Sequence, residues 1–282
     1  MRCFQGRLFT VDGMVEDEAP LKKEIYEQVR YYATTSVARR IEHIVQAIKL
    51  ACASEPPEIQ TDRIHVRNGT YFADGHFTPE KEYCMNRLPI AYVSDAPAPT
   101  RWLQFLNELL YEEDIPALQE YIGYCLLPVT KAQKMLLMVG KGGEGKSRIG
   151  LILRELFGSS MYTGSLQKVE TNRFARADLE YKLLLVDDDM KTEALPLTNN
   201  IKTLVTLEDK IDIERKGQQS VQGTLYVRFA CFGNGSLHAL YDKSNGFYHR
   251  QLLLTTKETE VFTMWILTCF CLSMFQARGI KR

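Results

Sequence analysis

The first hundred residues change from helical to strand-like spacing of apolar side chains. Residues 21 to 53 carry apolar side chains at helical spacing, with the Thr-Thr-Ser at 34 to 36 as a candidate break into two helices. Pro56 and Pro57 end the helical pattern, because proline lacks a backbone donor and disfavours helix at the preceding residue. Residues 63 to 72 alternate around an Asn-Gly pair, which predicts a β-hairpin. We expect a small mixed α+β region over residues 1–100.

A stretch rich in proline and alanine, residues 94 to 100, separates this region from two amphipathic segments. We expect these segments to form a helical collar over residues 101–131. From residue 134 the pattern becomes a short apolar run, a glycine-rich loop and a helix, and more apolar runs follow. This order predicts an α/β domain over residues 132–256, with a predominantly parallel sheet covered by helices.

Composition and charge limit the classes of function. The 35 Lys and Arg residues balance the 35 Asp and Glu residues, so DNA contact must come from local basic patches. Seven cysteines without a CxxC pair indicate reduced thiols in a cytoplasmic protein, and no zinc site. The uncharged segment 261–275 is shorter than the roughly 20 residues of a membrane-spanning helix, so we expect no membrane contact.

The strongest motif is GKGGEGKS at residues 140 to 147, which satisfies the phosphate-loop pattern GxxxxGK[ST] between an apolar run and a helix. Glycines let several backbone N–H groups converge on phosphates, and the helix N-terminus adds positive charge. The alternative is a glycine-rich turn that binds nothing. We expect Lys146 to neutralise the terminal phosphates of ATP and Ser147 to bind Mg²⁺. The predicted nucleotide-binding residues are Gly140, Lys141, Gly142, Gly143, Glu144, Gly145, Lys146 and Ser147.

Three carboxylates follow the apolar run at 182 to 186. We expect Asp187 to hold the magnesium through water and Asp188 to polarise the attacking water, with Asp189 as the alternative for that role. Adjacent carboxylates repel one another, and a divalent cation relieves this repulsion. The competing interpretation is a solvated acidic turn.

Two further segments carry polar candidates. Asn234 ends another apolar run between two glycines and is expected to orient water at the terminal phosphate, although a simple Asn-Gly turn has the same pattern. The segment 201–220 is locally basic and is expected to contact a DNA backbone, with a solvated hairpin as the alternative. Its candidate DNA-binding residues are Lys202, Lys210, Arg215 and Lys216.

With these elements in this order, residues 60 to 256 resemble the superfamily 3 helicase domain of phage and plasmid primase-helicases, the group related to satellite-phage and poxvirus replication proteins. The resemblance implies an AAA+-like P-loop fold and ATP-driven translocation on single-stranded DNA during replication of a mobile element. It matches GFYHRQ at 246–251 to the segment with the arginine finger, so Arg250 is expected to act on the triphosphate of a neighbouring subunit. A homo-oligomer, a hexameric ring, is therefore expected.

The sequence departs from the family pattern at both ends. We expect no primase domain before the helicase region, so a separate primase is a candidate partner. The hydrophobic tail at 257–282 is atypical, and either a frameshift or truncation or a genuine terminal helix explains it. Two other functions stay open: an ATP-binding remnant or regulator with little turnover, and a P-loop ATPase that acts on a protein partner.

Overall fold

The computed structural model describes residues 1–4, 6–33, 35–190, 198–207, 210–217, 219–234 and 245–258. The predicted hydrophobic tail lies outside the described residues, apart from its first two positions.

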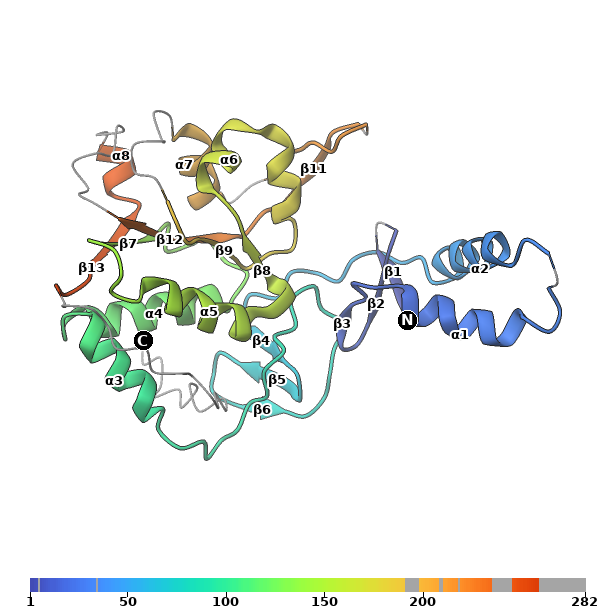
Figure 1. The fold of residues 1–282 in the computed structure, drawn as a ribbon, viewed down its shortest axis with the longest axis horizontal. Helices are drawn as coiled ribbons and strands as arrows, with labels where there is room; N and C mark the ends of the chain where they lie inside the picture. The colour runs from blue at the N-terminus through green and yellow to red at the C-terminus, as the bar shows by residue number, and fades with distance from the viewer. Residues whose placement is uncertain are drawn as a thin grey trace.

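The N-terminal region contains two small antiparallel sheets and a pair of helices, and the helix pair projects from the rest of the molecule (Figure 1). The first helix ends at Val29 and the second begins at Val37, which confirms the predicted break between them. The predicted hairpin is also confirmed, with Val66 paired to Gly69. The first sheet was not predicted. The elements are β1 (Arg2–Phe4), β2 (Arg7–Thr10), β3 (Gly13–Met14), α1 (Ala19–Val29), α2 (Val37–Ala51), β4 (Arg63–Val66), β5 (Gly69–Phe72) and β6 (Phe77–Thr78).

Two helices follow where the collar was predicted: α3 (Thr100–Leu109) and α4 (Asp114–Cys125). Arg228 connects α4 to the central sheet, because its guanidinium donates hydrogen bonds to the carbonyls of Cys125 and Val129. A cation at the C-terminus of a helix satisfies carbonyls that have no partner within the helix.

The central sheet has five parallel strands in the order β13-β7-β12-β9-β8, which confirms the predicted parallel sheet. Strand β12 therefore lies between β7 and β9. The strands are β7 (Met135–Gly140), β8 (Met161–Thr163), β9 (Leu184–Asp187), β12 (Arg228–Asn234) and β13 (Gln251–Thr255). The other elements are α5 (Lys146–Phe157), η1 (Gly158–Ser160), α6 (Leu166–Thr171), η2 (Arg173–Leu179), α7 (Asn199–Val205), α8 (Asn245–Tyr248) and a hairpin of β10 (Ile211–Ile213) and β11 (Val221–Gly223).

Helices cover both faces of this sheet, which explains why its strands are continuous apolar runs. Successive residues of β7 belong to different clusters: Leu136 and Met138 pack with α3, α4 and α5, whereas Met135 and Leu137 pack with α6 and α7. Figure 1 shows α4 and α5 on one side of the sheet and α6 and α7 on the other.

Within the described ranges, no helix is both long and apolar enough to cross a membrane. The five cysteines in those ranges are free thiols. No group of three or more potential metal-binding side chains of His, Cys, Asp and Glu occurs there either.

Candidate functional site

The glycine-rich loop connects β7 to α5 at the carboxyl edge of the parallel sheet. Gly142, Gly143 and Gly145 have φ angles of 109°, 85° and 108°. These left-handed conformations are strained for residues with a Cβ, so the turn requires glycine at all three positions. The loop thus delivers Lys146 and Ser147 to the first turn of α5, which confirms the predicted arrangement of strand, loop and helix.

The side chain of Glu144 points into this loop. Both carboxylate oxygens accept hydrogen bonds from the backbone N–H of Gly142 at 2.9 Å, and Oε2 lies 2.8 Å from the Lys146 ammonium. The side chains of Glu144 and Lys146 are only 4% and 6% exposed. Burial alone would raise the pKa of Glu144, but the hydrogen bonds from Lys146 and the loop amides leave that pKa lowered. The loop therefore holds an ionised carboxylate among its donors.

Asn234 lies beside the loop, as its predicted role requires. It ends β12 in register with Gly140 at the end of β7. A Cβ on Gly142 would lie 3.6 Å from the Asn234 side-chain oxygen. The parallel pairing of β7 and β12 brings this amide to the glycine-rich loop.

The acidic residues after β9 divide between the two faces of the sheet. Asp187 is 6% exposed, and its Oδ2 accepts a hydrogen bond from the Leu166 backbone at the start of α6. Asp188 is exposed on the opposite face, where a Cβ on Gly150 of α5 would lie 3.7 Å from its Oδ1. Asp189 is also exposed. Of the three carboxylates, Asp188 is thus on the same face as the helix that begins at Lys146.

Arg250 lies far from the loop within one chain. It immediately precedes β13, and Gln251 pairs with Met135 at the start of β7, whereas the loop follows the end of β7. The length of β7 separates the two by roughly 16 Å at about 3.3 Å per strand residue. The guanidinium donates a hydrogen bond to the Gly246 carbonyl. Within the described part of the chain, Arg250 and the loop therefore lie at opposite ends of β7.

The predicted DNA-binding residues are spread over α7 and the β10–β11 hairpin, which projects from the sheet (Figure 1). Lys216 is exposed, in the turn with Gly217, and Lys210 is exposed before β10. Lys202 is half-buried on α7. Arg215 instead forms an ion pair with Glu180, which is buried. The hairpin thus presents two exposed lysines and uses its arginine as an anchor.

Sequence reasoning missed two residues beside the loop. A Cβ on Gly140 would lie 2.1 Å from Thr256 Oγ1, so the end of β13 contacts the start of the loop. A Cβ on Gly145 would lie 3.5 Å from the Phe105 ring, so α3 also reaches the loop. Neither residue belongs to a short motif, and both reach the loop only through the tertiary fold.

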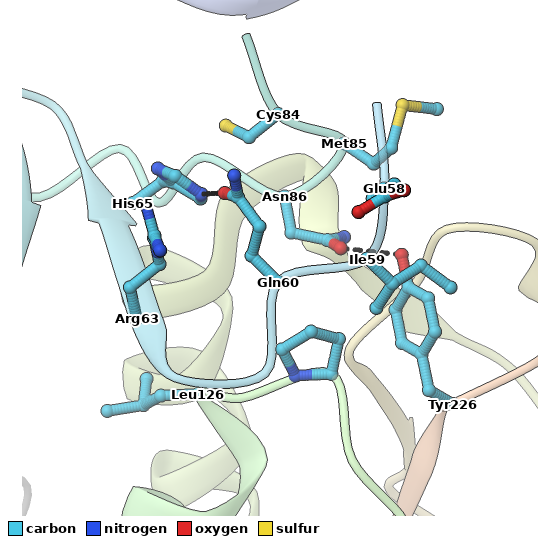
Figure 2. Close-up of a pocket in the computed structure, with 11 residues that line it drawn as sticks. Glu58, Ile59, Gln60, Arg63, His65, Cys84, Met85, Asn86, Leu126 and Tyr226 are labelled. Atoms are coloured by element: carbon cyan, nitrogen blue, oxygen red, sulfur yellow. Dashed lines mark hydrogen bonds between the residues drawn. The ribbon is translucent and has the colours of Figure 1, made fainter. Parts of the chain in front are cut away.

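A recess away from the loop lies next to the residues that precede β12 (Figure 2). Its lining residues are Glu58, Ile59, Gln60, Arg63, His65, Cys84, Met85, Asn86, Leu126, Pro128 and Tyr226. His65 forms a hydrogen bond with Gln60 at 2.6 Å, and the Tyr226 hydroxyl donates a hydrogen bond to Asn86 at 2.6 Å. Figure 2 marks both as dashed lines. Burial, followed by the charge of Arg87, lowers the pKa of His65 to about 4. No predicted site residue lines this recess, which joins the N-terminal region to the sheet.

Two family models match separate parts of the chain. Residues 9–110 match the family described as D5 N terminal like, and residues 138–250 match a family of unknown function, DUF5906. No curated protein sequence matches.

Among solved structures, two apo structures of the NrS-1 C-terminal region are similar. One is 15% identical, with a TM-score of 0.52, over 91% of this chain and 61% of that one. The other is 14% identical, with a TM-score of 0.51, over 89% and 56%. Our chain thus spans about three-fifths of their length and shares their fold. A JCV helicase structure overlaps 55% of this chain and 44% of its own at 18% identity, with a TM-score of 0.36 that is too low to establish a common fold.

Proposed function

We propose that this chain is the ATP-hydrolysing part of a DNA helicase that acts in the replication of a phage or plasmid-like element. The observation that carries the proposal is the meeting of a phosphate-binding loop, an asparagine and adjacent carboxylates at one edge of a parallel sheet. Lys146 and Ser147 begin α5, Asp188 follows β9 and Asn234 ends β12, and in our proposal all four would contact a triphosphate held by the loop.

The donor set fits an anion such as phosphate. The loop amide of Gly142 and the Lys146 ammonium already hold a carboxylate, which shows that their geometry suits anionic oxygens. Ser147 and one of the carboxylates at 187–188 would hold Mg²⁺, which supplies charge neutralisation at the phosphates. Asn234 would orient the attacking water, and an adjacent carboxylate would accept its proton.

The helicase part of the proposal has separate support. The D5 N terminal like match over residues 9–110 and the fold shared with the NrS-1 C-terminal region agree with the resemblance to superfamily 3 helicases. The distance of Arg250 from the loop of its own chain agrees with a composite site in an oligomeric ring. In that ring Arg250 would stabilise charge on the transferring phosphoryl group.

The experiment that tests the proposal is ATP hydrolysis by purified protein with and without a single-stranded oligonucleotide. Hydrolysis that the oligonucleotide stimulates, and that Lys146→Ala abolishes, is the expected result. Tight ATP binding without turnover at any protein concentration would favour an ATP-binding regulator. Turnover that is insensitive to DNA, with no salt-dependent affinity for the oligonucleotide, would favour an ATPase with a protein partner.

A further inference from the structure

The carboxylate of Glu144 accepts hydrogen bonds from the same donors that, in the proposed function, would bind phosphate. A phosphate-binding loop aims backbone N–H groups and a lysine ammonium at an anion. In this chain, the N–H of Gly142 and the ammonium of Lys146 instead donate to the carboxylate of Glu144, at 2.9 and 2.8 Å. The carboxylate also lies against Gly140, where a Cβ would be 2.7 Å from its Oε1 and 2.9 Å from the lysine nitrogen.

Glu144 and a phosphate group exclude one another from this position. Both are anions, and both need the ammonium of Lys146, whose side chain is only 6% exposed, while the Glu144 side chain is only 4% exposed. A phosphate would have to approach the buried Glu144 carboxylate, and burial weakens the screening of repulsion between like charges. Binding therefore requires the Glu144 side chain to leave the loop.

The backbone around Glu144 permits this movement. Gly143 and Gly145 flank it, and both have positive φ angles that glycine adopts without strain. No heavy atom lies within 4 Å of the position that a Cβ on Gly143 would take, so open space adjoins the segment. A rotation at these two glycines would swing the carboxylate outward and leave β7 and α5 in place.

We propose that Glu144 is an internal phosphate mimic, which keeps the loop closed to nucleotide until the triphosphate displaces it. The inference rests on the proposed function, because it assumes that this loop is the triphosphate site. It deepens that function by making nucleotide binding a competition with the chain's own carboxylate. The apparent dissociation constant equals the intrinsic dissociation constant divided by the fraction of molecules in which Glu144 has left the loop.

Glu258 offers a matched control. Its carboxylate pairs with Lys141 of the same loop at 2.8 Å, but both side chains are about three-quarters exposed. Glu258→Gln therefore also removes one negative charge next to this loop, but it leaves the Glu144 carboxylate inside the loop. Glu144→Gln keeps the size of the side chain, and Glu144→Ala removes it altogether.

The test is the dissociation constant of ATP with Mg²⁺, measured by calorimetric titration for the full chain and for these three variants, with Lys146→Ala as a fourth. We expect Glu144→Gln and Glu144→Ala to bind ATP about tenfold more tightly than the unmodified chain, as loss of a charge-assisted competitor predicts. We expect Glu258→Gln to stay within about twofold of the unmodified chain, because an exposed ion pair is screened by solvent. Lys146→Ala is expected to lose binding.

The possible failures are distinguishable. Equal ATP affinity in the unmodified chain and in both Glu144 variants overturns the phosphate mimic and leaves the proposed nucleotide site standing. An equal gain in Glu258→Gln and Glu144→Gln overturns it too, since the effect would then be general electrostatics. Binding by no protein at all overturns both proposals. Binding by the Glu144 variants alone supports the mimic and shows that the unmodified chain is closed.

Discussion

The carboxylate of Asp187 accepts a hydrogen bond from the backbone N–H of Leu166, with 2.7 Å between oxygen and nitrogen. The bond connects the end of β9 to the start of α6, on the face of the sheet opposite α5. Burial raises the pKa of Asp187 and the neighbouring carboxylates add to this, while the backbone hydrogen bonds oppose it. Asp187 thus has a structural role in addition to the magnesium role that its sequence position predicts.

Substitutions at Asp187 separate these two roles. We expect Asp187→Ala to lower the free energy of unfolding by about 1–2 kcal/mol, because the Leu166 N–H loses its partner. Asp187→Asn keeps an acceptor oxygen and is expected to be as stable as the unmodified chain, while ATP hydrolysis falls at least about 100-fold in both. Urea unfolding and steady-state ATPase assays measure the two effects. If Asp187→Asn hydrolysed ATP at the normal rate, Asp187 would not be the magnesium ligand, and Asp188, which lies on the same side of the sheet as α5, would take that assignment.

Mixed oligomers test whether Arg250 acts on a neighbouring chain. We expect Arg250→Ala and Lys146→Ala each to hydrolyse ATP at least about 1,000-fold more slowly than the unmodified chain. A mixture of the two variants is expected to recover activity, since an intact loop on one chain then meets an intact Arg250 on another. Absence of recovery, in a mixture that sizing shows to be assembled, would remove Arg250 from the composite site.

Arg215 and Lys216 are adjacent, but the structure predicts that substituting Lys216 weakens DNA binding, whereas substituting Arg215 lowers the stability of the fold. Lys216→Ala is expected to lower affinity for single-stranded DNA at every sequence, and to reduce the slope of log affinity against log salt by about 1. Arg215→Ala is expected to lower the free energy of unfolding by about 1–3 kcal/mol, because it leaves the Glu180 carboxylate buried without its cation. Fluorescence anisotropy in a salt series and urea unfolding distinguish the two. A normal DNA affinity for Lys216→Ala would exclude the turn of the hairpin from the DNA contact.

The buried imidazole of His65 predicts a loss of stability in mild acid. Its pKa of about 4 in the folded chain lies below the value of about 6.5 expected after unfolding. The neutral ring therefore contributes its full stability above about pH 6.5, and that contribution falls as the pH drops toward 4. Between pH 7.5 and 5, we expect the unmodified chain to lose roughly 2 kcal/mol more stability than His65→Gln. Parallel pH profiles of the two proteins would contradict this linkage.

Local signals in the sequence predicted many of the elements correctly. The Asn-Gly pair formed the turn between β4 and β5, and Gly142, Gly143 and Gly145 formed the loop before α5, whereas α2 ended at Ala51, before Pro56. In the turn and in the loop, a few adjacent residues determine the backbone angles, so no distant contact is needed. The strands β1, β2 and β3 escaped prediction because each has at most four residues, too few to establish a period.

Properties that depend on distant partners were not available from the sequence. The pairing of Arg215 with Glu180 joins residues 35 positions apart, and nothing in the local charge pattern distinguishes this arginine from Lys216. The insertion of β12 between β7 and β9 determines which side chains meet Gly142. The faces taken by Asp187 and Asp188 follow from where α5 and α6 pack. These features depend on the order of the strands in the sheet and on how the helices pack against it, neither of which a local sequence pattern determines.

The cluster that packs α3, α4 and α5 onto the sheet also includes Val66, Leu88 and Ile90 of the N-terminal region. These side chains are at least 94% buried although they precede the proline-rich stretch at 94 to 100. Heat or denaturant that releases β4 and β5 must therefore also expose the apolar surface of the collar and of the sheet. We therefore expect residues 63–90 and the central sheet to unfold together, with a single calorimetric transition for both.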